Sequence, residues 1–141
     1  MYEEDYLLRI INMMGVFLRA MLSALREHRP DDVRESAGQA LTLLLGMPPA
    51  LADSLTPDGL VTMLSVGDRF EAKRGVLAAE VFVRRALADD MSGLTESALA
   101  DRVRARRLLE AALLEGDDED VATAEALLDE LDALVSEGTG S

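Results

Sequence analysis

Carboxylates and arginines are the only side chains in this sequence abundant enough to build a chemical site. There is no Cys among the 141 residues, and His28 is the only imidazole. A catalytic triad or a His-based metal site needs His beside other reactive groups. His28 lies instead between Arg26 and Arg29, where the first expected helix ends and the helix dipole favours cations. We interpret His28 as a capping residue.

Two acidic features are candidates for a metal site, but neither has the required spacing. The run 117–120 (Asp-Asp-Glu-Asp) lacks the Asp-x-Asp-x-Asp-Gly pattern of a calcium loop, and helix capping explains acids at a helix N-terminus. Glu80 is the one carboxylate expected to point inward, whereas metal sites in helix bundles use several. No Gly-rich phosphate loop or nucleophile elbow occurs either. We therefore predict no catalytic residue, no metal, no cofactor and no enzymatic activity.

Arg102 and Arg106 form a basic pair one turn apart on an expected helix, 95–116. Acids of the last helix are expected opposite them, at Asp118, Glu125, Asp129 and Asp132. Two interpretations are open. The arginines form ion pairs across the helical hairpin, worth a fraction of about 1 kcal/mol each when exposed, or they line a groove for an anionic group. The neighbouring acids favour the ion pairs.

Helix-forming residues and regularly placed breakers predict an all-α fold, a bundle or short stack of helical hairpins with five main helices plus a short one. The main helices are expected at 3–28, 31–46, 68–88, 95–116 and 118–136, with shorter helical segments near 50–54 and 57–65. Small residues along 68–88 would let other helices approach, so this helix is expected at the centre. Gly-Asp corners at Gly67 and Gly116 give a weak likeness to tetratricopeptide repeats, but they lie 49 residues apart instead of about 34.

The charge is concentrated in the second half of a single predicted domain, 1–137, which a disordered tail, 138–141, follows. Residues 1–88 hold 12 acids and 10 bases, whereas residues 89–141 hold 15 acids and 4 bases. Nucleic acids and anionic membranes are poor partners for such a chain, because both attract clustered Lys and Arg. A basic partner or basic peptide is the partner class that the charge favours, but surface acidity more often serves solubility.

No membrane span is expected. The most apolar window, 10–18, has nine residues between Arg9 and Arg19, whereas a spanning helix needs about 20. Acids at positions 3–5 occupy the place where a secretory signal carries Lys or Arg. The absence of Cys fits a reducing compartment, and we predict a cytoplasmic protein.

The first helix carries more apolar surface than one neighbour covers. One heptad seam runs from Leu7 to Leu25, and a second seam lies beside it at Tyr6, Ile10, Met13, Phe17, Ala20 and Ala24. Both seams could pack within the monomer, the second could form a homodimer through Tyr6, Ile10, Met13, Phe17 and Ala24, or the helix could lie on a membrane. We predict a non-enzymatic protein–protein interaction or scaffold module that binds another protein or itself. The alternatives are an acidic nucleic-acid mimic or decoy and an enzyme with a carboxylate-based site.

The opening sequence Met-Tyr-Glu-Glu-Asp-Tyr-Leu-Leu-Arg-Ile-Ile, residues 1–11, resembles the start of a family of short, uncharacterised bacterial helical proteins. Members typically begin with Asp-Tyr, two apolar residues and Arg, followed by an apolar helix. The resemblance is specific over residues 1–11 and loose beyond them. It implies a bacterial cytoplasmic helical protein and assigns no functional residue.

Overall fold

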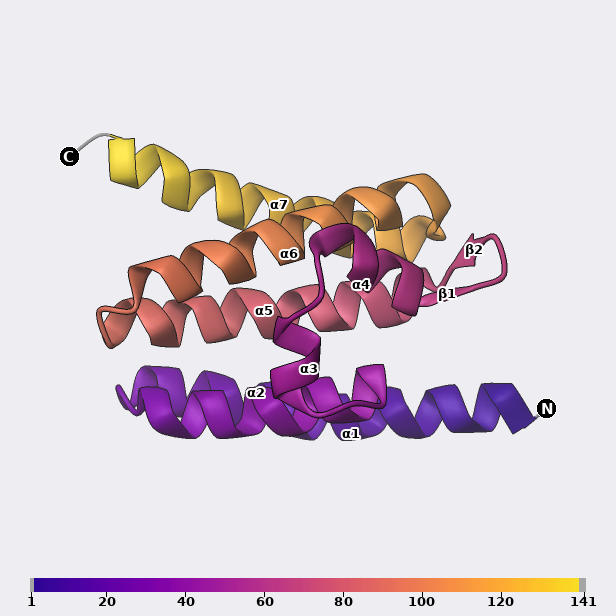
Figure 1. The fold of residues 1–141 in the computed structure, drawn as a ribbon, viewed down its shortest axis with the longest axis horizontal. Helices are drawn as coiled ribbons and strands as arrows, with labels where there is room; N and C mark the ends of the chain where they lie inside the picture. Colours follow the sequence, from indigo (N-terminus) through magenta and orange to yellow (C-terminus); the bar gives the residue numbers. More distant parts are fainter. Residues whose placement is uncertain (1, 140–141) are drawn as a thin grey trace.

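The computed structural model describes the backbone of residues 2–139 and the side chains of residues 5–134, and this part is all-α with one small hairpin (Figure 1). The long helices are α1 (Tyr2–Arg26), α2 (Pro30–Leu45), α5 (Ala72–Met91), α6 (Thr95–Glu115) and α7 (Asp118–Thr139). The short elements are α3 (Pro49–Asp53), α4 (Pro57–Met63) and the strands β1 (Ser65–Val66) and β2 (Arg69–Phe70). The prediction of an all-α fold is confirmed.

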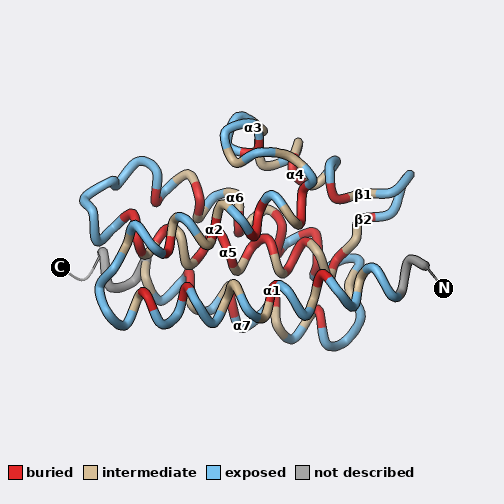
Figure 2. The backbone as a smooth tube through the Cα atoms, turned by 90° about the horizontal axis from the view of Figure 1, so that it is seen from below, coloured by how far each residue is buried: buried red, intermediate tan, exposed pale blue. Residues whose placement is uncertain are grey.

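Helix α5 lies between two layers. In Figure 1, α1 and α2 lie below α5, and α6 and α7 lie above it. Contacts join α5 to all four of these helices. Small buried residues on α5, at Gly75, Ala78, Ala79 and Ala86, let neighbouring backbones approach. Figure 2 shows the buried positions concentrated along this middle of the bundle. The predicted central position of this helix is confirmed.

Local capping signals fix several helix ends as the sequence predicts. The Thr56 hydroxyl accepts the Gly59 N–H at 2.9 Å and caps α4. At the start of α7, the Asp117 and Asp120 carboxylates each accept the other's backbone N–H, at 2.8 and 3.3 Å. His28 follows α1 in a left-handed conformation, φ 55°, and Arg29 N–H bonds the Ala24 carbonyl at 2.8 Å. This is a Schellman motif, so His28 does take part in the C-cap.

The corner at Gly67 and Asp68 is a β-turn, and the predicted helix start at this point is wrong. β1 and β2 pair antiparallel around the two residues, with Val66 opposite Arg69, and Gly67 supplies the positive φ of 64°. Helix α5 begins only at Ala72. Gly116, in contrast, has an extended conformation and links two helices directly, so the two Gly-Asp corners are not a structural repeat.

Phe70 fastens this hairpin to the helices. Its ring lies directly against the backbone of Gly75, where a Cβ atom would be 2.2 Å from the ring Cζ. Its backbone N–H donates to the Glu115 carboxylate at 2.6 Å. The hairpin therefore joins the start of α5 to the end of α6.

The C-terminal helix packs through one apolar side. Ala124, Leu127 and Leu131 on this side are buried. α7 extends to Thr139, so residues 138 and 139 of the predicted tail are helical, and residues 140–141 lie outside the described backbone.

Replacing Gly75 with Ala tests the Phe70 contact. Because the new methyl group must displace the ring, we expect Gly75→Ala to lower the free energy of unfolding by about 1–3 kcal/mol. Gly15→Ala is the matched control, because its Cβ would meet only the flexible Arg19 side chain. In urea unfolding, that control should gain about 0.5–1 kcal/mol from helix propensity. A Gly75→Ala protein as stable as Gly15→Ala would contradict the packing of Phe70.

Candidate functional site

Some of the basic residues form ion pairs with described carboxylates, and others do not. Ten of the 14 bases bridge to a carboxylate within 4 Å, and seven of these ten reach a carboxylate of another helix or of the residue that caps it. Among the described side chains, the bases without such a pair are Arg9, Arg19 and Arg26 on α1 and Arg69 on β2. The charges still available to a partner therefore gather on α1 and at its N-terminal end.

The α6 groove, between the start of α4 and α7, contains both predicted arginines. Its volume is about 430 Å³. Leu99, Val103 and Leu131 provide apolar lining, and Arg107 joins Arg102 and Arg106 as the charged lining. Leu99 is 62% exposed, so the groove is open to solvent.

Each arginine of the α6 groove holds a carboxylate from a different helix. Arg106 bridges to Asp132 of α7 at 2.7 Å, which is the pairing expected across the hairpin. Arg102 bridges instead to Asp90 of α5, and Arg107 binds Asp58 of α4 at 2.7 Å. Asp118, Glu125 and Asp129 make no ion pair with either predicted arginine. The positive charge of the groove is thus already matched, which supports the ion-pair interpretation.

A buried charge network beside the groove was not predicted. Asp101 is 1% exposed and accepts two hydrogen bonds from Arg85, both at 2.8 Å, and one from Arg104 at 2.8 Å. Arg85 also reaches Asp53, at 2.7 Å. Burial lowers the pKa of Arg85, but the bonds and charges of Asp101 and Asp53 outweigh it and raise that pKa overall. The guanidinium groups of Arg85 and Arg104 both lie over the Phe82 ring, 5.4 and 5.9 Å from its centre.

A second buried acid, Asp89, joins α5 to α2. It accepts a hydrogen bond from Arg34 at 3.3 Å. Burial, together with the charge of Asp101, raises the pKa of Asp89, while Arg34 and Arg85 oppose that rise. Only the i,i+3 spacing of Asp101 and Arg104 was visible in the sequence, because the partners Arg85 and Arg34 arrive from other helices.

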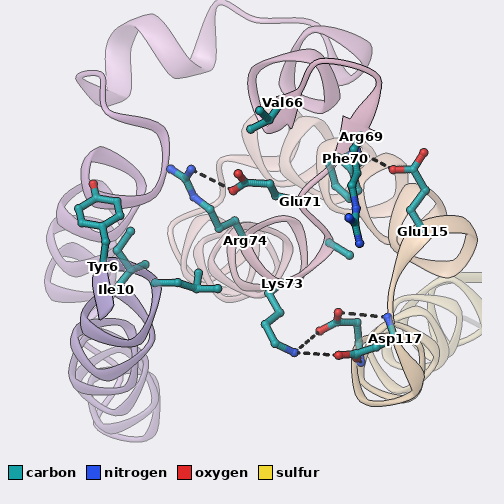
Figure 3. A pocket seen from close by; sticks show the side chains of 13 residues that line it. Tyr6, Ile10, Val66, Arg69, Phe70, Glu71, Lys73, Arg74, Glu115 and Asp117 are labelled. Atoms are coloured by element: carbon teal, nitrogen blue, oxygen red, sulfur yellow. Dashed lines mark hydrogen bonds and ion pairs between the residues drawn. The ribbon is translucent and has the colours of Figure 1, made fainter. Parts of the chain in front are cut away.

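A cavity of about 600 Å³, which we call the N-terminal pocket, lies at one end of the bundle (Figure 3). Tyr6 and Ile10 of α1 line one side, Asp117 lies on the other, and Lys73 and Arg74 of α5 lie between them. Its volume falls in the range of small-molecule sites, which is about 300–1,000 Å³.

The polar groups of this pocket are already engaged with one another. Lys73 bonds Asp117 at 3.2 Å and Asp120 at 3.3 Å. Burial lowers the pKa of Lys73, but these two carboxylates raise it overall. The bonds to the Asp120 N–H and to Lys73 lower the pKa of Asp117. Arg74 binds Glu71 and the Leu44 carbonyl. The lining includes no His, Cys or Ser, and its one amine, Lys73, is held by Asp117 and Asp120.

Helix α1 presents a row of exposed residues that the rest of the monomer leaves uncovered. We call this row the α1 face: Tyr6, Arg9, Met13, Val16, Ala20 and Ser23. Tyr6 is 58% exposed, Met13 48% and Val16 57%. The α1 face thus leaves three large apolar side chains exposed, and α6 exposes a second set at Leu99, Val103, Leu113 and Leu114.

The interface predicted on this helix needs a correction. Ile10 and Ala24, at 1% and 3% exposure, are buried within the monomer, and Phe17 is half-buried against the core. Helices α2 and α5 pack against α1 and cover residues of both seams. Met14 and Met21, from the first seam, are therefore buried as well. Of the five predicted interface residues, Tyr6 and Met13 remain exposed.

One described helix segment, Asp5–Arg26 of α1, is long and apolar enough to cross a membrane by length and composition. Its mean hydropathy is 1.5, and 22% of it is buried. The prediction of no membrane span treated Arg9 and Arg19 as the ends of the apolar window, so it considered only the nine residues 10–18. Buried core helices and signal sequences share this length and composition.

No group of three or more His, Asp or Glu side chains is placed to hold a metal ion within the described part of the chain. Comparison with known proteins finds no matching family model, no similar curated protein and no similar solved structure. The resemblance of residues 1–11 to a bacterial family stays a prediction.

The buried network predicts a large effect for Asp101→Asn. Removing this charge leaves Arg85 and Arg104 without their buried counter-ion, so the free energy of unfolding should fall by about 3 kcal/mol or more. Asp132→Asn, which removes the exposed partner of Arg106, should cost at most about 1 kcal/mol. Equal losses for the two variants in urea unfolding would show that the network is not a main source of stability.

The burial of Glu80 predicts that the stability of the fold depends on pH. Burial raises its pKa, Arg84 opposes this, and Glu130 adds to it. Because the folded pKa exceeds the unfolded one, protonating Glu80 stabilises the fold, and this stability is lost as the pH rises through the folded pKa. Glu80→Gln should therefore be more stable than the unmodified chain at pH 7, and the difference should vanish towards pH 4. Thermal unfolding across this range measures it; a gain independent of pH, or equal to that of exposed Glu125→Gln, would contradict it.

Proposed function

We propose that this protein is a non-enzymatic interaction module whose α1 face holds another protein. One observation carries the proposal: exposed apolar side chains and unpaired bases coincide on α1. Tyr6, Met13 and Val16 lie there beside Arg9 and Arg19, for which the described side chains offer no ion pair.

Burial of this face would supply binding energy. Completely burying a large apolar side chain is worth about 1.5–3 kcal/mol. Tyr6, Met13 and Val16 are each about half exposed, so covering them recovers roughly half of that amount per residue. Met13 is flexible and polarisable, which suits a packing surface.

The other surfaces support a binding role less well. The arginines of the α6 groove are matched by Asp90, Asp132 and Asp58. In the N-terminal pocket, the charged side chains bind one another, and the lining includes no His, Cys or Ser. An enzyme with a carboxylate-based site is therefore the weakest of the three proposals.

The exposed acids of α7 support a second candidate, a nucleic-acid mimic. Asp118, Glu125, Asp129 and Asp132 share one side of the helix and are exposed. They extend over 14 residues, or about 21 Å, whereas one DNA strand carries about six phosphates over that length. Four carboxylates, one of them already bound to Arg106, give a lower charge density than DNA. We therefore rank this function second.

A photo-reactive amino acid in place of Met13 tests the proposed function in the cells that naturally express the chain. Because the α1 face is expected to be covered, irradiation should give covalent adducts with a protein. Leu114, 86% exposed on α6, is the matched control position and should give several-fold fewer. Equal yields at the two positions, or lipid adducts alone at position 13, would contradict the proposal.

A further inference from the structure

We infer that the partner of the α1 face is a second copy of this chain, packed antiparallel to the first. The inference rests on the proposed function and names its partner. It is carried by the spacing, the side-chain sizes and the charges of α1.

The spacing of the α1 face is that of a helix–helix seam. Its members follow one another at intervals of three, four, three, four and three residues, from Tyr6 to Ser23. This alternation keeps one side of a helix against a partner helix over its length. α1 has 25 residues, or about 37 Å at 1.5 Å per residue, and its N-terminal end projects beyond α2 (Figure 1). A long helix therefore fits this face better than a short loop does.

The side-chain sizes select an antiparallel register. When the twofold axis passes between Met14 and Gly15, Tyr6 lies opposite the partner's Ser23, and Arg9 lies opposite the partner's Ala20. Met13 then meets the partner's Val16 near the axis. Each large side chain at one end faces a small one at the other, so the seam is complementary to itself.

The charges select the same direction. Asp5 and Arg26 are both exposed and lie on the same flank of α1, near opposite ends. In the antiparallel pair, Asp5 lies beside the partner's Arg26, and the arrangement occurs twice. In a parallel pair, this flank would instead face the opposite flank of the partner, where Ile10, Phe17 and Ala24 carry no charge. Opposite charges on neighbouring helices stabilise the antiparallel arrangement, and the parallel one lacks such pairs.

A second copy also suits this face better than the other occupants. An anionic bilayer would repel a chain of net charge −13. A strongly basic partner is better matched to the acids of α7, on the opposite side of the molecule (Figure 1).

Introduced cysteines test the register, because the chain has none of its own. Tyr6→Cys, Ser23→Cys and an equal mixture of the two proteins are treated with a short thiol–thiol cross-linker. In the antiparallel pair, Tyr6 and the partner's Tyr6 are about 25 Å apart along the axis, whereas facing helices are about 8–10 Å apart. The mixture should therefore form cross-linked dimers, and each single protein should form several-fold fewer.

Two results would overturn the inference. Cross-linking of Tyr6→Cys alone, as efficient as that of the mixture, would show a parallel pair. A mass of 15.3 kDa by light scattering at every concentration, with no cross-linking, would exclude the second copy. Protein adducts from position 13 in cells would then still support the proposed function with a different partner, so the two failures are distinguishable.

A charged substitution completes the test with cysteine-free proteins. Val16→Asp places a charge near the twofold axis and should raise the dimer dissociation constant about tenfold or more. Leu114→Asp, also at an exposed position, should leave that constant unchanged. At concentrations well below the dissociation constant, where all three proteins are monomers, both variants should unfold at the same urea concentration as the unmodified chain. Equal dissociation constants for the two variants, or binding to anionic vesicles in place of dimerisation, would contradict the second copy.

Discussion

The Asp101 network holds together the centre of a strongly acidic protein. A net charge of −13 repels itself, and the chain counters this by placing its few bases between helices. Arg85 and Arg104 surround Asp101 at the junction of α5 and α6, where Arg85 also reaches Asp53 at the end of α3. Arg34, Arg106 and Arg107 then connect α2, α7 and α4 to the same two helices. These ion pairs tie α2, α4 and α7 to the central helices α5 and α6.

Helix α1 differs from the other long helices, because no described ion pair joins it to them. Its packing against α2 and α5 is apolar, through residues such as Ile10 and Met21, and no described ion pair ties its arginines to the bundle. The apolar residues that α2 and α5 do not cover lie beside those arginines. A surface with both features is suited to binding a partner helix. The charges of α1 are complementary to those of a second α1 that runs in the opposite direction. The proposed dimer follows from this combination.

The sequence predicted the features that depend on neighbours along the chain. Asp117 and His28 take the capping roles expected of them, because capping bonds span only a few residues. Features that depend on distant residues were missed or wrong. Gly67 and Asp68 look the same whether they begin a helix or turn a hairpin, and the contacts of Phe70 with Gly75 and Glu115 that accompany the hairpin are not visible in the local sequence. Ile10 and Ala24 share a seam with Met13, but the arc that α2 and α5 cover cannot be read from periodicity. The pairing of Arg102 with Asp90, in place of an acid on α7, has the same origin.

The distance between two spin labels at position 23 tests the central claim most directly, since it reports association and direction together. With Ser23→Cys labelled in both copies, the antiparallel register places the two labelled backbones about 25 Å apart along the helix axis. We expect a single distance distribution near that value, and the dipolar signal should weaken when the protein is diluted. A distance near 10 Å would indicate parallel helices, and the absence of dipolar coupling at high protein concentration would contradict self-association through α1.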